Sequence, residues 1–203
     1  MEYEVIESSS SGNCVIVGDV MVDIGVGFNR IKKKLYDIKV VIITHVHSDH
    51  VKRATYDRIR KLFPHITIVG NWQVHQDYGV DVVSNPGFDF KVKGYTFTPF
   101  KMYHDVECHG YSWEVGGERV LFATDTYSLK GVDADWKYDY LFIEANHDVK
   151  KVERARNEYR GSYNPYLEAQ RHLSVDDCRT FYYLNRKNED SVLIELHRSS
   201  RFY

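Results

Sequence analysis

Four side chains of the kinds that bind metal ions lie close together in this chain of 203 residues. The apolar run Val40–Ile43 and the single residue Thr44 are followed by these four, which are His45, His47, Asp49 and His50. Imidazole and carboxylate groups suit zinc or manganese, but at these spacings they converge only where the backbone curls tightly after a strand. The cluster therefore predicts a metal site, and a surface group of histidines without function is the alternative.

Three further residues of the same chemical kinds occur later in the chain. His104, Asp125 and His197 each follow an apolar run directly. Active-site loops are often found at such polar ends of strands. Each residue alone would more often have a hydrogen-bonding role at a strand end. Together with the histidine cluster, the three supply enough donors for two metal ions.

The elements that must position these residues alternate between strands and helices. Strands are expected at Tyr3–Ile6, Cys14–Val17, Val20–Ile24, Lys39–Thr44, Ile66–Val69, Tyr95–Pro99, Tyr111–Val115, Arg119–Ala123, Tyr138–Ile143 and Ser191–Leu196. Helices are expected at Phe28–Tyr36, Val51–Phe63, Val149–Tyr159 and Ser174–Arg186. Because strands dominate and many are joined by tight turns, two sheets covered by helices fit better than a doubly wound parallel sheet. No linker or repeat divides the chain, so we expect one α/β domain over residues 1–203.

The composition excludes several classes of protein. Hydrophobic residues make up 43% and charged residues 28%, which is typical of a globular chain and not of a disordered one. No apolar run approaches the roughly 18–20 residues that span a membrane, and Met1–Glu4 does not resemble the start of a signal peptide. The three cysteines show no metal-finger spacing and favour a reducing compartment. We therefore expect a cytoplasmic protein without a membrane partner, with the oligomeric state open between a monomer and a homodimer.

The order of the candidate ligands resembles that of the metallo-β-lactamase superfamily, and the resemblance runs nearly from end to end. Met21–Gly25 is similar to the superfamily's early strand that ends in Asp-x-Gly, and Ser8–Cys14 is similar to the loop before it. The resemblance implies a four-layer αβ/βα sandwich with a site for two divalent metal ions, zinc or manganese. Carried over by position, it implies a ligand set of His45, His47 and His104 for one ion, Asp49, His50 and His197 for the second, and Asp125 bridging the two.

Shorter motifs resemble particular branches of the superfamily. Glu144–Asp148 and His172–Ser174 are similar to the YycJ/WalJ-type branch, which is regarded as DNA exonucleases, and the second motif is also similar to ribonuclease Z. The ending His197–Phe202 looks closer to ribonuclease Z. Family members commonly have glycine where this chain has Arg53 and Arg171. These departures add cations near the expected cleft and favour a polyanionic substrate.

The implied site predicts catalytic roles for several residues. Two metal ions roughly 3.5–4 Å apart can share a water molecule and lower its pKa toward neutrality. Asp49 can orient or deprotonate this water, and His172 resembles a histidine that donates a proton to the leaving oxygen. Glu144 or His147 can hold His172 or a metal ligand in place. The alternatives are a polar residue leading into a helix for His172 and plain strand-end hydrogen bonding for Glu144 and His147.

Two basic segments predict a surface that binds nucleic acid. Lys52–Lys61 contains five cations and one acid, and Lys150–Arg171 contains six cations and three acids with tyrosines between them. Cations contact phosphates and tyrosines stack on bases, so Arg53, Arg160 and Arg171 are predicted contacts. The alternative is an ordinary solvated helix face.

The sequence thus favours a dinuclear metal-dependent phosphodiesterase, a DNA or RNA nuclease that uses a metal-bridging hydroxide. The first alternative is a metallo-hydrolase for a small substrate, such as a cyclic nucleotide phosphodiesterase or a thioesterase. The second is a metal-binding or interaction module without catalytic activity. The complete ligand set argues against the inactive module.

Overall fold

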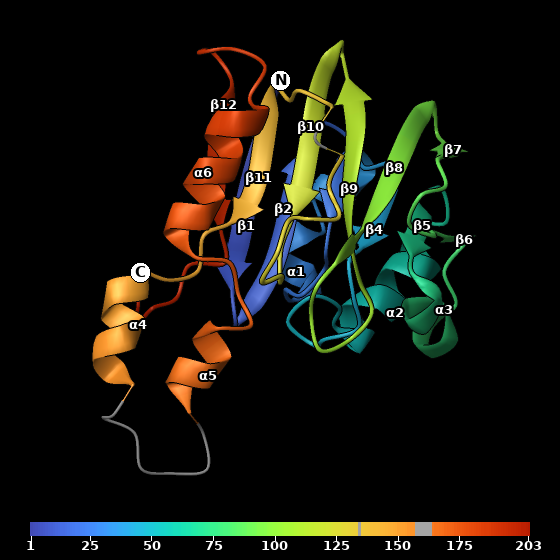
Figure 1. Cartoon of the computed structure of the whole chain (residues 1–203). Coiled ribbons are helices and arrows are strands. Elements are labelled where there is room, and N and C mark those ends of the chain that lie inside the picture. The colour runs from blue at the N-terminus through green and yellow to red at the C-terminus, as the bar shows by residue number, and fades with distance from the viewer. Residues whose placement is uncertain (134, 157–163) are drawn as a thin grey trace.

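The computed structural model describes residues 1–133, 135–156 and 164–203, and its strands form two six-stranded sheets. In spatial order, the first sheet contains β1 (Tyr3–Ser9), β2 (Gly12–Val17), β3 (Val20–Val22), β4 (Val40–Ile43), β5 (Thr67–Gly70) and β6 (Val82–Val83). The second contains β12 (Val192–Leu196), β11 (Tyr140–Glu144), β10 (Glu118–Ala123), β9 (Cys108–Val115), β8 (Tyr95–Met102) and β7 (Phe90–Val92). The second sheet lies in front of the first in Figure 1.

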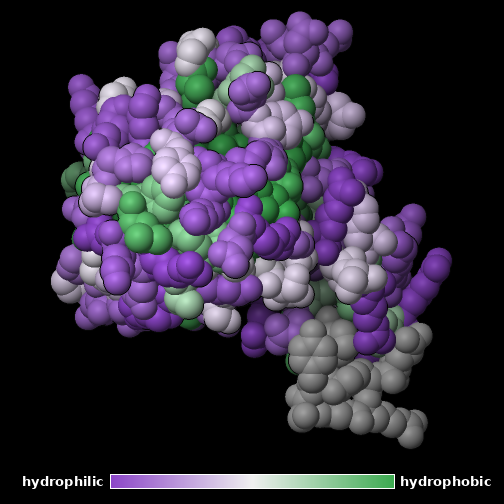
Figure 2. All heavy atoms as spheres, turned by 180° about the vertical axis from the view of Figure 1, so that it is seen from behind, coloured by the Kyte–Doolittle hydropathy of each residue, from purple (hydrophilic) through white to green (hydrophobic). Residues whose placement is uncertain are grey.

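Helices cover the outer faces of both sheets. The first sheet carries α1 (Phe28–Ile31), the short 3₁₀ helix η1 (Lys34–Tyr36), α2 (Arg53–Leu62) and α3 (Trp72–Tyr78). The second sheet carries α6 (Val175–Asn185), whereas α4 (Val149–Ala155) and α5 (Pro165–Ala169) extend beyond one end of the sandwich (Figure 1). From behind, most of the surface is hydrophilic and surrounds smaller apolar areas (Figure 2). Among the described residues, no helix is long and apolar enough to cross a membrane.

The strand β4 shows why this sequence forms a layered structure. All of its residues are apolar and fully buried. Val40 and Ile42 belong to the core between the two sheets, whereas Val41 and Ile43 pack against the helices of the first sheet. A strand that is covered on both faces requires such a continuous apolar run instead of an alternating pattern. The expected four-layer αβ/βα sandwich is therefore confirmed.

The segments after β3 and after β5 are among the regions that differ from the expected elements. The single helix expected at Phe28–Tyr36 is wrong, because α1 ends at Ile31 and η1 follows separately. A segment this short does not form a stable helix alone, so the packing of its buried side chains decides its shape. The helix α3 was not expected, although Asn71 caps its first turn by accepting a hydrogen bond from Val74 N and Gly79 ends it in the left-handed conformation.

Strand direction brings one end of both sheets together. The strands β3, β4 and β5 are parallel, as are β10, β11 and β12. Two antiparallel pairings make β8 run in the same direction as β10. The carboxyl ends of such strands meet at one edge, which is where open α/β sheets usually place their sites. The loops after these strands carry the candidate ligands.

Candidate metal centre

The loop between β4 and α2 curls tightly and holds four of the predicted ligands. His50 N and Val51 N both donate hydrogen bonds to His47 O, each at 2.9 Å, which closes the turn. The loop rests on the first sheet, because Asn13 N donates to Asp49 O at 2.7 Å. A Cβ atom on Gly25 would lie 1.6 Å from Asp49 O, so only glycine fits here. This contact explains the glycine of the Asp-x-Gly sequence.

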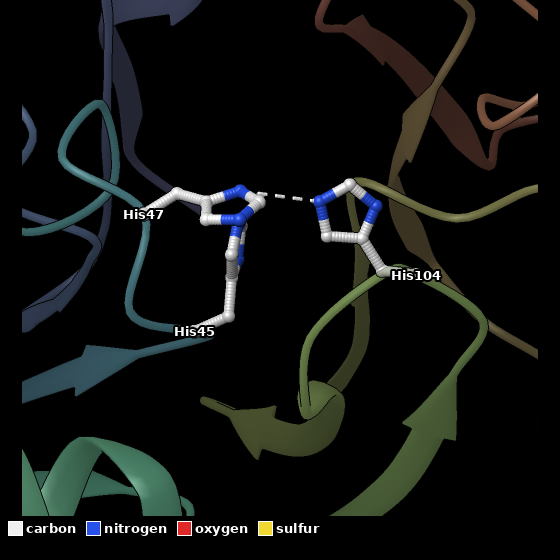
Figure 3. Close-up of side chains that lie close together, drawn as sticks. All are labelled: His45, His47 and His104. Atoms are coloured by element: carbon white, nitrogen blue, oxygen red, sulfur yellow. Dashed lines mark hydrogen bonds between the residues drawn. The ribbon is translucent and has the colours of Figure 1, made fainter. Parts of the chain in front are cut away.

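His45, His47 and His104 form the first cluster, and their candidate ligand atoms lie within 4.8 Å of one another. His47 and His104 point toward each other from the loops after β4 and β8, with His47 Nδ1 3.3 Å from His104 Nε2 (Figure 3). Two nitrogen ligands of one tetrahedral zinc ion lie roughly this far apart, given Zn–N distances of about 2.0–2.1 Å. Among the described residues, His45 Nε2 is buried without a hydrogen-bond partner. The geometry and this unpaired atom fit a metal ion.

Asp49, His50 and His197 form the second cluster, whose candidate ligand atoms also lie within 4.8 Å of one another. Asp125 lies beside it, with Oδ2 3.0 Å from His50 Nε2 and Oδ1 3.7 Å from His197 Nε2. Asp125 also groups with His45 and His50 at the same 4.8 Å limit. It therefore lies next to both clusters, which is the position that a bridging ligand requires. His197 Nε2 is buried and has no hydrogen-bond partner in the part of the chain that the structure describes.

Two of these residues have an uncommon backbone conformation. Asp125 and His197 have φ angles of 52° and 50°, in the left-handed region that side chains other than glycine seldom adopt. Such residues persist where the surrounding structure enforces them, often at functional sites. Both follow parallel strands of the second sheet, and the unusual turn aims their side chains toward the loop after β4.

The charges in this centre balance one another. Burial alone would raise the pKa of Asp125, but His197 and His50 hold it well below its usual range. Burial alone would lower the pKa of His50, but Asp125 and Asp23 raise it well above its usual value. Burial lowers the pKa of His45 well below its usual value. Ionised carboxylates beside a neutral His45 provide donors for a cation.

The buried carboxylate of Glu144 connects several parts of the site. Its Oε1 lies 2.6 Å from His172 Nδ1 and 3.1 Å from His197 Nδ1. Its Oε2 accepts a hydrogen bond from Thr126 N at 2.8 Å. Burial alone would lower the pKa of His172, but Glu144 raises it to about 9. Of the two residues expected to hold His172 or a ligand, Glu144 has these contacts.

His147 and the predicted arginine contacts lie in different surroundings. In the described ranges, no hydrogen bond joins His147 to His172 or to a predicted ligand, and its buried Nδ1 has no partner. Arg53 packs over the Tyr78 ring at 3.8 Å and does not line the metal pocket, a cavity of about 160 Å³ beside the two clusters. Arg171 does line this pocket, and Arg160 lies outside the described residues. The nucleic-acid roles of these arginines stay predictions.

Three polar residues at the centre were not predicted as site residues, although Asp23 belongs to the Asp-x-Gly sequence. Asp23 Oδ2 lies 2.7 Å from His50 Nδ1, and Asn13 Nδ2 lies 2.9 Å from His50 Nε2. Asp105 Oδ1 lies 3.1 Å from His104 Nε2. Asp23 ends an apolar run, and His104 was predicted from its position at the end of such a run, so the same signal was available for Asp23. Asn13 and Asp105 have no comparable signal, because small polar residues are common in turns.

A pocket of about 160 Å³ opens onto the two clusters. Its walls include residues of both clusters together with Ser10, Asp105, Asp125, Glu168, Arg171 and His172. Arg171 lies 3.3 Å from Glu168 and 3.9 Å from Asp105, so carboxylates neighbour its guanidinium. Five of the seven predicted ligands and His172 thus line one small polar cavity, whereas His45 and His50 belong to the two clusters without lining it. Their roles in binding and catalysis stay predictions.

No protein-family model and no curated protein sequence matches this chain. Several solved structures are similar to this chain in fold. The metallo-β-lactamase fold protein YhfI from Bacillus subtilis has 17% identity and a TM-score of 0.69, over 97% of this chain and 85% of that chain. The short form of human tRNase Z has 18% identity and a TM-score of 0.69, over 99% and 93%. A diphosphatase of the PhnP family has 16% identity and a TM-score of 0.65, over 98% and 87%. The chain therefore has the metallo-β-lactamase fold.

Proposed function

We propose that this protein is a dinuclear metal-dependent phosphodiesterase that cleaves DNA or RNA. The observation that carries the proposal is the pair of adjacent ligand clusters with Asp125 beside both. In this proposal His45, His47 and His104 hold one ion, and Asp49, His50 and His197 hold the second. Nitrogen and carboxylate donors suit zinc or manganese. Two such ions, when bound, lower the pKa of a shared water and stabilise charge on a phosphate.

Asp49 is the residue best placed to orient the attacking water. Its carboxylate is partly exposed in the metal pocket, and Oδ2 lies 3.5 Å from His50 Nε2. Asn13 Nδ2 donates a hydrogen bond to the same oxygen at 3.3 Å. One oxygen is thereby held in place, which leaves the other to accept a proton from water. A positioned general base of this kind contributes roughly 10²–10⁴-fold to a rate.

His172 is suited to protonate the leaving oxygen. Glu144 contacts its Nδ1 and keeps the pKa at about 9, so His172 carries a proton at neutral pH. Because Nδ1 is engaged by Glu144, Nε2 remains the nitrogen that can donate to substrate. His172 lines the metal pocket, which gives this proton access to a bound phosphodiester.

The choice of nucleic acid rests on several supporting observations. Arg171 lies at the pocket, where it can contact a phosphate. Two of the similar structures are, by their names, a tRNase and a diphosphatase, both of which act on phosphorus-containing bonds. The resemblance of Glu144–Asp148 to the exonuclease branch favours DNA, and that of His197–Phe202 to ribonuclease Z favours RNA. The three free cysteines support action in a reducing compartment, the cytoplasm.

A small phosphodiester, such as a cyclic nucleotide, is the second candidate substrate. The metal pocket measures only about 160 Å³, and Arg171 lies near two carboxylates that offset its charge. Both features suit a small molecule better than a long polyanion.

The test uses purified full-length protein loaded with zinc or manganese. We expect it to cleave labelled single- or double-stranded DNA or RNA, and Asp49→Asn to slow cleavage roughly 10²–10⁴-fold. Asp190→Asn, at an exposed position between α6 and β12, is the matched control and should leave the rate unchanged. Turnover of a cyclic nucleotide without cleavage of any polymer would favour the second candidate. Saturation at no more than about one metal ion per chain would contradict the dinuclear site.

A further inference from the structure

A second pocket, larger than the metal pocket, adjoins the metal centre. It has a volume of about 550 Å³, and His104 lines both pockets. Its other walls include Lys101, Tyr103, Glu107 and Tyr127, which come from β8, the loop after it and the loop after β10. A group attached to a phosphate at the metal centre therefore lies within reach of this cavity. The side chains that line this pocket therefore help to decide which substrate the metal centre accepts.

Two tyrosines form an aromatic wall of this pocket. The rings of Tyr103 and Tyr127 lie 5.6 Å apart between centroids and are tilted by 47°. Lys101 Nζ lies 5.6 Å from the centre of the Tyr103 ring. Tyr127 is 56% exposed, so much of its ring is free to contact a ligand. Exposed aromatic rings beside a cation are the groups on which single-stranded nucleic acids stack their bases.

The tyrosine wall is tied to the catalytic residues through backbone hydrogen bonds. Tyr127 N donates to Tyr103 O at 3.2 Å, and Tyr103 N donates to Thr126 Oγ1 at 3.0 Å. Thr126 N donates in turn to Glu144, the carboxylate that also contacts His172 and His197. The backbone positions that carry both rings are therefore tied to the metal centre. A preformed surface of this kind loses little conformational entropy when a ligand binds.

We propose that the second pocket binds the nucleobase of the nucleotide next to the cleaved phosphate, by stacking it on Tyr127 and Tyr103. The proposal rests on the proposed function and specifies its substrate as a nucleotide ester. Lys101, at the edge of the pocket, contacts an adjacent phosphate. The Glu107 carboxylate accepts a hydrogen bond from a base amino group. The pocket selects substrates that carry an aromatic base over other phosphodiesters.

Binding of adenosine 5′-monophosphate and of ribose 5-phosphate to the metal-loaded protein tests this proposal by calorimetry. Both probes carry the same phosphate and sugar, but only the first has a base. We expect the first to bind roughly 5- to 150-fold more tightly, which is the range for stacking of one base. Tyr127→Ala should remove this preference without changing the affinity for ribose 5-phosphate or the metal content. Tyr127→Phe should keep the preference, because stacking does not need the hydroxyl group.

The matched control is Tyr183→Ala, which removes an exposed tyrosine on α6 and should change neither affinity. Equal affinity for the two probes would overturn the proposal, as would a preference that persists in Tyr127→Ala. The same preparations are assayed for cleavage of DNA and RNA. Cleavage without a base preference refutes the base pocket alone. A base preference without cleavage supports the pocket and contradicts the nuclease.

Discussion

The two ligand clusters receive different support from the rest of the protein. Two buried carboxylates contact histidines of the second cluster. Asp23 lies 2.7 Å from His50, and Glu144 lies 3.1 Å from His197. In the first cluster, His45 Nδ1 lies 3.1 Å from the neutral Thr44 hydroxyl. Two histidines of the second cluster therefore contact charged carboxylates, whereas His45 of the first cluster contacts a neutral hydroxyl group.

One histidine of each cluster also differs in burial. The side chain of His50 is fully buried, whereas that of His47 is 36% exposed. A carboxylate behind a histidine fixes its ring orientation and makes its other nitrogen a stronger donor. Buried carboxylates thus hold two histidines of the second cluster, whereas the first cluster includes a half-buried histidine that lines the pocket. We expect the second cluster to bind its ion more tightly, and the variants below test this difference.

The largest effect is expected for Glu144→Gln. The amide presents two N–H donors where the carboxylate accepts from Thr126 N and contacts two histidines. We expect the unfolding free energy to fall by about 1–3 kcal/mol and the metal affinity of the second cluster to fall roughly 10- to 100-fold. Cleavage slows further, because His172 loses its partner. Urea denaturation, metal titration and cleavage rates measure the three effects.

Glu189→Gln, at an exposed position, is the control and should change none of these quantities. Unchanged metal affinity in Glu144→Gln would remove the distinction between the clusters.

Asp23→Asn is expected to have the next largest effect. Asn preserves the shape and tolerates the φ angle of 62° at this position, so the backbone remains. We expect the affinity of the second cluster for zinc to fall roughly 10- to 100-fold. The measurement uses a His47→Ala background, in which the first cluster is incomplete, and competition with a chromophoric chelator. An equal loss in a His197→Ala background, which disables the second cluster, would show that Asp23 supports both.

The smallest effect is expected for Cys108→Ala. Cys108 Sγ lies 3.7 Å from His45 Nδ1, and burial raises the pKa of its thiol, so the group stays neutral. Weak contacts of this kind are worth below about 1 kcal/mol, so the affinity of the first cluster should change less than about fivefold. Chelator competition in the His197→Ala background measures it. A loss as large as that of Asp23→Asn would mean that the first cluster also depends on its surroundings.

The sequence predicts local features of this site better than distant ones. His45, His47, Asp49 and His50 stand out because neighbours along the chain form one turn. Asp23 was missed because its role depends on the pairing of β3 with β4, which aligns Val22 with Ile42 and brings Asp23 beside the loop. Pairing between strands is set by tertiary contacts that composition does not reveal.

The motif that contains Glu144 and His147 shows the same limit at shorter range. Both residues carry suitable side chains, and the sequence favours neither. Glu144 is the last residue of β11, where it faces His172, whereas His147 lies beyond the strand and pairs by its backbone with Ser174. In contrast, two sheets covered by helices followed from the number of strands and the tight turns between them, which depend on the local order of residues, and the resemblance to the superfamily implied the four-layer sandwich.

The distribution of the ligands over both sheets links the metal supply to folding. Four predicted ligands follow β4 of the first sheet, and three follow strands of the second. An ion held by both sets binds only when the two sheets are packed together, so it acts as a ligand of the native state. At a free concentration one hundred times the dissociation constant, such a ligand adds about 2.7 kcal/mol to the stability. Metal starvation would thus lower the abundance of the folded protein in addition to its activity.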